Sequence, residues 1–326
     1  MNNESVSGQK SSRIKLTADG VQNLTVFLIL LGSIAVGTIM KPNLFLTPTN
    51  LMNILLSSSS IIMVAAAVTL VLISGNLDLS VSGMGAMGAV LFGLMTLNGV
   101  PIPLALILAL MIGMGFGFAC GYSIAKFKLP SFIISLAFNY ISRGIALIGA
   151  NGAVVFGLPY GIDKIGTTIN GLPLPVVYAF AAVLIFMFIQ GKTTFGSKVY
   201  AVGANILSAK LSGINEKAVI SRAFMFSGMM AAFAGVVLTS RFIAADSGIL
   251  QTLHADCIIV AVLGGTDING GRGTVLGMLI GALFVGVLTN IMNLNDMTVY
   301  VQNVVRGIVL IVAILMNNII RSRIRV

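Results

Sequence analysis

Three residues near the middle of the chain resemble a nucleotide-binding loop. Gly191, Lys192 and Thr193 match the end of the pattern G-x-x-x-x-G-K-[ST], in which backbone amides and the lysine hold phosphates. That pattern needs a glycine five residues before Gly191, where the chain has Phe186 within a long apolar run. We therefore interpret the tripeptide as a chance match and expect this chain to bind no cofactor.

Few side chains are available for catalysis or for metal binding. His254 is the single histidine, which excludes H-E-x-x-H and multi-histidine metal sites. Cys120 and Cys257 both lie in apolar stretches, so neither a disulfide framework nor a metal cluster is expected. We predict no catalytic residue and no metal-binding residue, which disfavours a membrane-embedded enzyme.

Two polar, glycine-rich stretches interrupt the apolar runs in a similar way. Residues 73–90 read ISGNLDLSVSGMGAMGAV, and residues 263–281 read LGGTDINGGRGTVLGMLIG. Aligning Asp78 with Asp267 also aligns two pairs of glycines, which hints at an internal repeat. Matched interruptions in the two halves of a transporter point towards its substrate path. The predicted translocation-path residues are Gly75, Asn76, Asp78, Ser80, Gly265, Asp267 and Arg272.

Asp78 and Asp267 each have a second interpretation. An aspartate just before a helix can cap the free N–H groups of the first turn. The same residue can instead line a polar cavity, and the two roles are compatible because the end of a broken helix can face a solute.

Three charged residues, Arg143, Arg306 and Asp256, lie inside or beside apolar segments. A charge at the centre of a bilayer costs about 2.5–3.5 kcal/mol. Each arginine should therefore face the bundle interior and find a partner, or extend to the membrane surface. Asp256 and Asp78 are the candidate partners, and the sequence leaves the pairing open.

The composition indicates what kind of molecule must position these residues. Of the 326 residues, 57% are hydrophobic and 9% are charged, against about 25% charged residues in soluble domains. The mean hydropathy is +1.04, and the 37 glycines suit helices packed closely in lipid. The net charge of +10 is scattered between apolar runs, so we attribute it to membrane orientation rather than to nucleic acid. The chain is predicted to be an all-α, polytopic membrane protein.

Apolar runs set the number of crossings, because a helix needs about 20 residues to span a bilayer. We place full-length segments at 24–40, 51–74, 80–97, 102–125, 131–150, 174–190, 218–240, 274–293 and 300–319. The basic residues lie mostly in loops of one side, which predicts that both termini are cytoplasmic. That orientation needs one more crossing near the C-terminus, so the short run 255–265 should count as a broken or re-entrant element. About ten membrane segments result.

These segments divide the chain into three regions. Residues 1–23 form a cytoplasmic tail without a cleavage site, residues 24–320 form the membrane domain, and residues 321–326 form a basic cytoplasmic tail. Within the membrane domain, the polar residues 191–217 are expected on the cytoplasmic side.

The polar segment 191–217 contains a predicted short helix. From Ile206 onward, apolar residues recur at helical spacing beside small ones. Gly213 is expected to end this helix, and Asn215 with Glu216 to cap the next one. An ordinary solvated loop is the alternative.

Three motifs, in order along the chain, resemble the permease subunits of bacterial ABC importers of the ribose, xylose and arabinose type. SGNLDLSVS at 74–82 resembles a GGIDLSVG motif, FGSKVYAVGANILSAKLSGI at 195–214 resembles a cytoplasmic segment, and LGGTDINGGRGTVLGMLIGA at 263–282 resembles a glycine-rich stretch of that family. The resemblance covers about residues 44–316. The chain departs from the family at 74–77 and at 254–256, where the family has Glu-Leu-Asp, so the identity of the sugar stays open.

The resemblance implies a helical permease bundle in the bacterial inner membrane that forms half of an importer. In such an importer two permeases pair, as identical copies or as paralogues. Two ATPase subunits bind the cytoplasmic face and use ATP and Mg, and a periplasmic binding protein delivers a pentose, a hexose or a related polyol.

The resemblance also places the helix of segment 191–217 against the ATPase. The residues assigned to this contact are Gly203, Asn205, Ala209, Gly213 and Ile214. Transport of a nucleoside or of an autoinducer-like sugar derivative is the alternative function, and an ion-coupled secondary transporter is less favoured.

Overall fold

The structure, a computed structural model, describes residues 18–324. Over that range the backbone forms twelve α-helices, one 3-10 turn and one two-stranded hairpin. The elements are α1 (Ala18–Met40), α2 (Pro48–Ile73), α3 (Val81–Leu97), α4 (Ile102–Phe127), α5 (Ser131–Gly149), η1 (Ile162–Ile165), β1 (Thr168–Ile169), β2 (Leu172–Pro173), α6 (Leu174–Lys192), α7 (Thr194–Ala204), α8 (Ile206–Leu211), α9 (Glu216–Phe242), α10 (Leu253–Leu263), α11 (Val275–Leu294) and α12 (Val299–Ile324).

Helix length and hydropathy confirm the predicted all-α membrane architecture. Six helices of the described chain are long and apolar enough to cross a membrane, namely α2, α4, α5, α6, α9 and α11. Four shorter apolar helices, within α1, α3, α10 and α12, lie at the remaining predicted segments. The sequence predicted neither α7 nor the β1–β2 hairpin. Of the predicted tails, 1–23 and 321–326, residues 1–17 and 325–326 lie outside the described residues, whereas 18–23 belong to α1 and 321–324 to α12.

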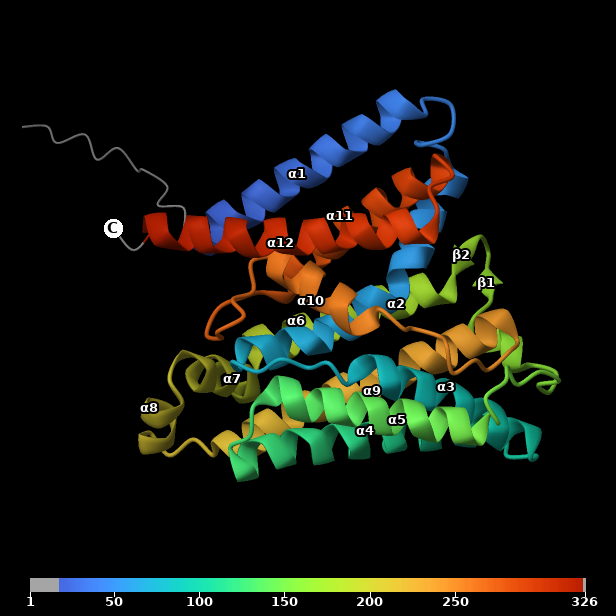
Figure 1. Ribbon diagram of the computed structural model, residues 1–326, viewed down its shortest axis with the longest axis horizontal. Helices are drawn as coiled ribbons and strands as arrows, with labels where there is room; N and C mark the ends of the chain where they lie inside the picture. The colour runs from blue at the N-terminus through green and yellow to red at the C-terminus, as the bar shows by residue number, and fades with distance from the viewer. Residues whose placement is uncertain (1–17, 325–326) are drawn as a thin grey trace, which may run out of the picture.

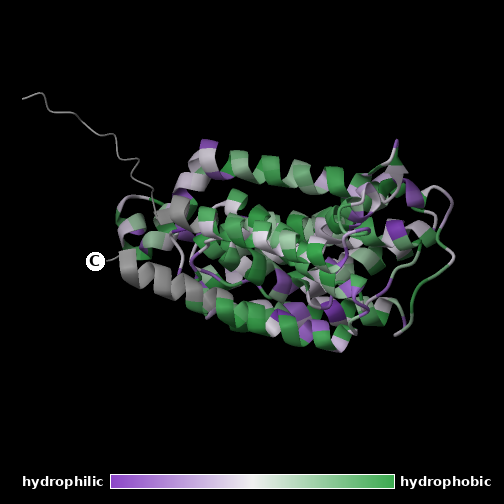
Figure 2. Cartoon of the chain, turned by 90° about the horizontal axis from the view of Figure 1, so that it is seen from above, coloured by the Kyte–Doolittle hydropathy of each residue, from purple (hydrophilic) through white to green (hydrophobic). Residues whose placement is uncertain are grey.

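The long helices run roughly parallel along the length of the molecule (Figure 1). The first turns of α1 and the C-terminal end of α12 lie at the same end as α7 and α8. Figure 2 shows apolar residues along most of the helices and many of the hydrophilic ones in the connections. We refer below to the end with α7 and α8 as the α7–α8 end.

Helices α2 and α9 form the centre of the bundle. In their apolar windows 78% and 72% of the residues are buried, against 22% in α4 and 17% in α5. The outer helices therefore present apolar side chains to lipid or to another protein. This pattern is the reverse of a soluble protein, in which exposed helix faces are polar.

Glycines allow α4 and α9 to pack closely. A side-chain carbon added at Gly113 would lie 2.6 Å from the carbonyl oxygen of Gly228, and one added at Gly121 would lie 2.9 Å from Cα of Ser221. No real Cβ atom fits at such distances, so the two backbones meet directly at these positions. The glycine spacing of α4 thus serves helix packing rather than ligand binding.

Helix α5 is unusual because its buried face is polar. Its buried residues are Ser135, Asn139, Ser142 and Ala146, which recur at helical spacing along one side. Tyr140 and Ile148 on the outer side are 68% and 79% exposed. The polar face of α5 lies against α3, where the candidate site begins.

Candidate translocation site and coupling segment

The chain between α2 and α3 is extended and enters the bundle before α3 begins. The N–H of Leu77 donates to Oγ of Ser131 at 3.0 Å, beside the first turn of α5. The N–H of Gly83 donates to Oδ1 of Asn139 at 2.6 Å, about two turns further along α5. Helix α3 therefore starts well inside the bundle. Gly75 has φ +81°, and asparagine and aspartate side chains compete for backbone hydrogen bonds, so residues 74–80 do not form a helix.

Helix α10 also starts inside the bundle, but it runs in the opposite direction. Its eleven residues rise about 16 Å at 1.5 Å per residue, roughly half of a hydrocarbon layer of about 30 Å. Cβ atoms added at Gly264 and Gly281 would meet the backbones of Gly277 and Val260, so α10 is antiparallel to α11. The prediction that this short segment is a broken membrane element is confirmed.

The N-terminal ends of α3 and α10 meet each other at Ser82 and His254. The backbone N–H of His254 donates to Oγ of Ser82 at 3.0 Å, and the same Oγ lies 2.8 Å from Nδ1 of His254. The first turn of each helix also carries the positive end of the helix dipole. The two helix ends meet at Ser82 and His254 within an otherwise apolar bundle, and we call this place the polar centre.

Asp78 joins the extended segment to α9. Its Oδ1 accepts from the N–H of Ser80 at 2.8 Å and from Oγ of Ser80 at 2.5 Å. Its Oδ2 accepts from Oγ of Ser227 at 2.6 Å, near the middle of α9. The N-cap of α3 is Ser80, whose side chain makes no capping bond, so the capping interpretation of Asp78 is wrong. Asp78 is fully buried, and in this conformation its carboxylate faces neither solvent nor an open path.

The two arginines have different partners. Nε of Arg306 lies 3.9 Å from Oδ1 of Asp256. The other carboxylate oxygen of Asp256, Oδ2, accepts from Oγ1 of Thr252 at 2.9 Å. Arg143 donates from Nη1 to the carbonyl oxygen of Ser247 at 2.9 Å rather than to a carboxylate. Both arginines contact partners within the described chain, which agrees with the first of the two interpretations.

Two buried polar atoms of α5 have no hydrogen-bond partner within the described chain. They are Nη2 of Arg143 and Oγ of Ser142, one on each of two consecutive residues of α5. Buried polar groups are normally paired. The unpaired donor of Arg143 and the unpaired hydroxyl of Ser142 therefore mark a place on α5 where a polar ligand would gain hydrogen bonds.

The second polar stretch has a different position from the first. Asp267 closes a tight loop, in which its Oδ1 accepts from the N–H of Asn269 at 2.9 Å. Thr274, and not Asp267, caps α11 by accepting from the N–H of Gly277 at 2.9 Å. The capping interpretation of Asp267 is therefore wrong as well. Asp78 lies beside the middle of α9 whereas Asp267 lies in a loop at one end of the bundle, so the aligned aspartates are not structurally equivalent.

The residues before Asp78 nevertheless contact the residues after Asp267. The N–H of Gly271 donates to the carbonyl oxygen of Ile73 at 2.8 Å. A Cβ atom at Gly270 would lie 2.6 Å from Cα of Gly75. The end of α2 and the loop 264–273 thus form one junction at the α7–α8 end. Arg272 on that loop is exposed.

In the GKT sequence, Lys192 is the last residue of one helix and Thr193 is the N-cap of the next. Helix α6 ends at Lys192, and Thr193 caps α7 by accepting from the N–H of Gly196 at 3.2 Å. The same hydroxyl donates to the carbonyl oxygen of Ile189. This geometry explains the polar residues here without a phosphate-binding loop.

The predicted short helix in segment 191–217 is confirmed as α8, and so are its boundaries. Gly213 has φ +79° just after the helix, and Asn215 caps α9 by accepting from the N–H of Ala218 at 3.1 Å. Helix α7 was not predicted, since the sequence suggested only an exit from the membrane before Ile206.

Two of the five residues assigned to the ATPase contact pack against other parts of this chain. Ala209 is only 4% exposed and packs in the core. A Cβ atom at Gly203 would lie 2.6 Å from the N–H nitrogen of Gly271, so Gly203 contacts the junction. Ala209 is too buried to contact an ATPase directly, so its assignment is wrong, whereas Gly203 is partly exposed and its assigned contact stays a prediction. The apolar residues that α8 does expose are Ile206, Leu207 and Leu211, at 50%, 66% and 82%.

Hydrogen bonds attach α7 to the start of α11. Tyr200 donates from its hydroxyl to the carbonyl oxygen of Gly273 at 2.6 Å. Gln190, at the end of α6, donates to the same oxygen at 3.2 Å and accepts from the N–H of Val275 at 3.0 Å. Displacing α7 would therefore displace the loop that precedes α11 and the end of α2.

Comparison with known proteins agrees with this architecture. Residues 50–314 match the family described as "Branched-chain amino acid transport system / permease component". The chain belongs to this permease family. The match covers most of the chain and includes both polar stretches, the polar centre and the α7–α8 segment.

The permease has close relatives among curated proteins. It is 37% identical over 303 residues to the ribose import permease protein of Bacillus subtilis (strain 168), covering 92% of this chain and 94% of that protein. It is 31% identical over 296 residues to the D-allose transport system permease protein of Escherichia coli (strain K12), covering 90% and 91%. It is 31% identical over 299 residues to the L-arabinose ABC transporter permease protein of Azospirillum brasilense, covering 91% and 87%. The permease is a multi-pass inner-membrane transport protein and not an enzyme.

Several residues of the polar centre were not predicted from the sequence. Ser82 meets His254, and Ser227 meets Asp78, only through contacts between distant segments. The polar face of α5 could have been found, since Ser135, Asn139 and Ser142 recur at helical spacing within an apolar segment.

Proposed function

We propose that the permease carries a sugar across the inner membrane as one transmembrane half of an ATP-driven importer. The sugar would be a pentose, a hexose or a related polyol, since the relatives named above are permeases for ribose, D-allose and L-arabinose. The observation that carries the proposal is the polar centre at which α3 and α10 begin.

The chemistry of the polar centre suits a molecule with many hydroxyl groups. A sugar needs donors and acceptors to replace water, because an unpaired polar group costs free energy when it leaves water. The permease offers an imidazole beside Ser82 and, on α5, a guanidinium whose Nη2 has no partner, and His254 and Arg143 are only partly buried. The ion pair of Asp256 and Arg306 fixes the start of α10 nearby.

The α7–α8 segment is the proposed contact for the ATPase. Its exposed face includes Asn205, Leu211 and Gly213, and Ile214 is partly exposed beside them. A force on this face would reach α2 through Gly203 and would reach α11 through Tyr200. Since α2 continues directly into residues 74–80, the same movement would reach Asp78 and the polar centre.

In the proposed complex, separate chains carry out membrane passage, ATP hydrolysis and delivery of the sugar. Two permeases, as identical copies or as paralogues, pair in the bilayer, and two ATPase subunits bind at the α7–α8 end, which is then cytoplasmic together with both termini. A periplasmic protein delivers the sugar. ATP and Mg bind the ATPase, and this chain binds no cofactor.

Uptake into proteoliposomes tests the proposal. The complete complex, with its ATPase and binding protein, is reconstituted with ATP inside, and uptake of labelled ribose, allose, arabinose, a nucleoside and leucine is measured. We expect uptake of one sugar that requires both ATP and the binding protein. Uptake driven by an ion gradient without ATP, or uptake of leucine or the nucleoside alone, would contradict the proposal.

A further inference from the structure

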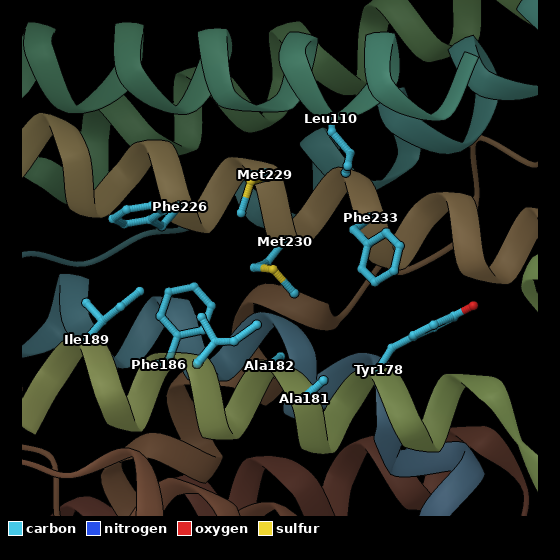
Figure 3. Close-up of a pocket in the computed structure, with 11 residues that line it drawn as sticks. Leu110, Tyr178, Ala181, Ala182, Phe186, Ile189, Phe226, Met229, Met230 and Phe233 are labelled. Atoms are coloured by element: carbon cyan, nitrogen blue, oxygen red, sulfur yellow. The ribbon is translucent and has the colours of Figure 1, made fainter. Parts of the chain in front are cut away.

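A second feature of the permease lies on its outer side, away from the polar centre. Helices α4, α6 and α9 enclose an apolar groove of about 250 Å³. Phe226, Met230 and Phe233 of α9 and Phe186 of α6 point into it (Figure 3). The lining side chains are aliphatic, aromatic or methionine, and the hydroxyl of Tyr178 is at one end (Figure 3).

A basic pocket of about 290 Å³ lies between α4 and α9, closer to the α7–α8 end. Lys217 and Arg222 of α9 line it together with Tyr122 of α4. A third cation is close, since Nζ of Lys126 is 5.1 Å from the centre of the Tyr122 ring. Glu216 is the acidic residue in the first turn of α9, and it does not line the pocket.

The groove and the basic pocket are consecutive along one face of α9. Ala218, Arg222, Phe226, Met229 and Phe233 follow one another at spacings of three or four residues, which places them on the same side of the helix. From Arg222 to Phe233 the helix rises about 16 Å, close to the depth of one leaflet of a hydrocarbon layer of about 30 Å. The surface is therefore cationic at the membrane boundary and apolar inside the membrane.

We infer that this surface is a binding site for an anionic phospholipid. The phosphate would lie between Lys217 and Arg222, beside the first turn of α9, whose dipole is positive at this end. One acyl chain would fill the groove between Phe186 and Phe233. Basic pockets between membrane helices are suited to anionic head groups, and a soluble anion alone would leave the groove empty.

A lipid fits this surface better than a second copy of the chain. Only 22% of the apolar window of α4 and 33% of that of α6 is buried, so both helices expose long apolar faces. The chain carries a net charge of +10. A second copy docked face to face here would bring Lys217 and Arg222 against a like-charged pocket, which is unfavourable.

Native mass spectrometry of the purified permease tests the inference. The protein is titrated with phosphatidylglycerol, with phosphatidylcholine of the same chain length, and with inorganic phosphate, and the bound fraction and melting temperature are measured. We expect phosphatidylglycerol to bind at least about 10-fold more tightly than phosphatidylcholine, a difference of about 1.4 kcal/mol. We expect phosphate alone to raise the melting temperature by less than phosphatidylglycerol does.

Paired variants separate the two parts of the site. Arg222→Gln with Lys217→Gln should remove the preference for phosphatidylglycerol, whereas Lys164→Gln, on an exposed turn elsewhere, should keep it. Ala181→Phe should fill the groove and weaken binding of both lipids, whereas Ala119→Phe, on the exposed part of α4 outside the groove, should not. Equal affinity for the two lipids in the unaltered permease would overturn the inference, and so would an unchanged preference in the Arg222 and Lys217 variant. A permease dimer that dissociates only in Ala181→Phe would instead indicate a second copy.

Discussion

Replacing Gly203 by alanine is expected to uncouple the permease from its ATPase. A Cβ atom here would lie 2.6 Å from the nitrogen of Gly271 and closer still to the carbonyl oxygen of Ile73. These two atoms are hydrogen-bonded to each other at 2.8 Å. Gly203→Ala must therefore push α7 away from the junction or break that bond.

The size of the effect follows from the two contacts. One extra methyl group in a tightly packed place costs about 1–3 kcal/mol, and a lost hydrogen bond costs about 0.5–1.5 kcal/mol. A coupling free energy of 1–3 kcal/mol corresponds to a change of about 5- to 150-fold. We therefore expect sugar-stimulated ATP hydrolysis to fall at least about 5-fold, while the permease still inserts and binds the ATPase.

The assay is ATP hydrolysis by the complete complex in nanodiscs, with and without the loaded binding protein. Gly191→Ala is the matched control, because nothing lies within 4 Å of its Cβ position. Full stimulation in Gly203→Ala would refute the proposed route through α7. Loss of folded permease in this variant would refute it too, because the junction would then serve folding rather than coupling.

Three further outcomes are expected. Ser227→Ala removes a buried hydrogen bond to the carboxylate of Asp78 and should lower the free energy of unfolding by about 1.5–3 kcal/mol; an unchanged melting temperature in detergent would show that this bond stabilises nothing. Leu211→Glu should leave the melting temperature unchanged, since the side chain is 82% exposed, but should weaken ATPase binding in a pull-down, and normal binding would remove Leu211 from the contact. Asp256→Asn should reduce folded permease by leaving the charge of Arg306 unpaired, and Arg306→Gln in the same chain should restore part of it; failure of this rescue would show that the two residues act independently.

Local patterns in the sequence predicted much of the fold. Apolar runs placed the membrane helices, and the turn residues around Gly213 and Asn215 placed the ends of α8 and α9. These signals depend on residues that are close together in the sequence, so a single sequence is enough to detect them. Helix α7 was missed because its sequence holds two glycines and starts directly after a membrane helix.

The contacts that build the site could not be read from one sequence. Asp78 bonds Ser227 across 149 residues, and Ser82 meets His254 across 172. Only the packing of α3, α9 and α10 brings these side chains together. The orientation of Ala209 was also out of reach, since a helix of six residues has too few turns to define a buried face by periodicity.

Chemical labelling of the polar centre tests the central claim most directly. A single cysteine at His254, in a permease with Cys120 and Cys257 replaced by alanine, is exposed to a hydrophilic thiol reagent during transport. If the centre lies on the sugar path, this cysteine reacts in the working complex and the transported sugar slows the reaction. Tyr140→Cys, on the outer face of α5, should react no faster with or without sugar. A cysteine at His254 that never reacts, or that reacts equally with and without the sugar, would contradict a sugar path between α3 and α10.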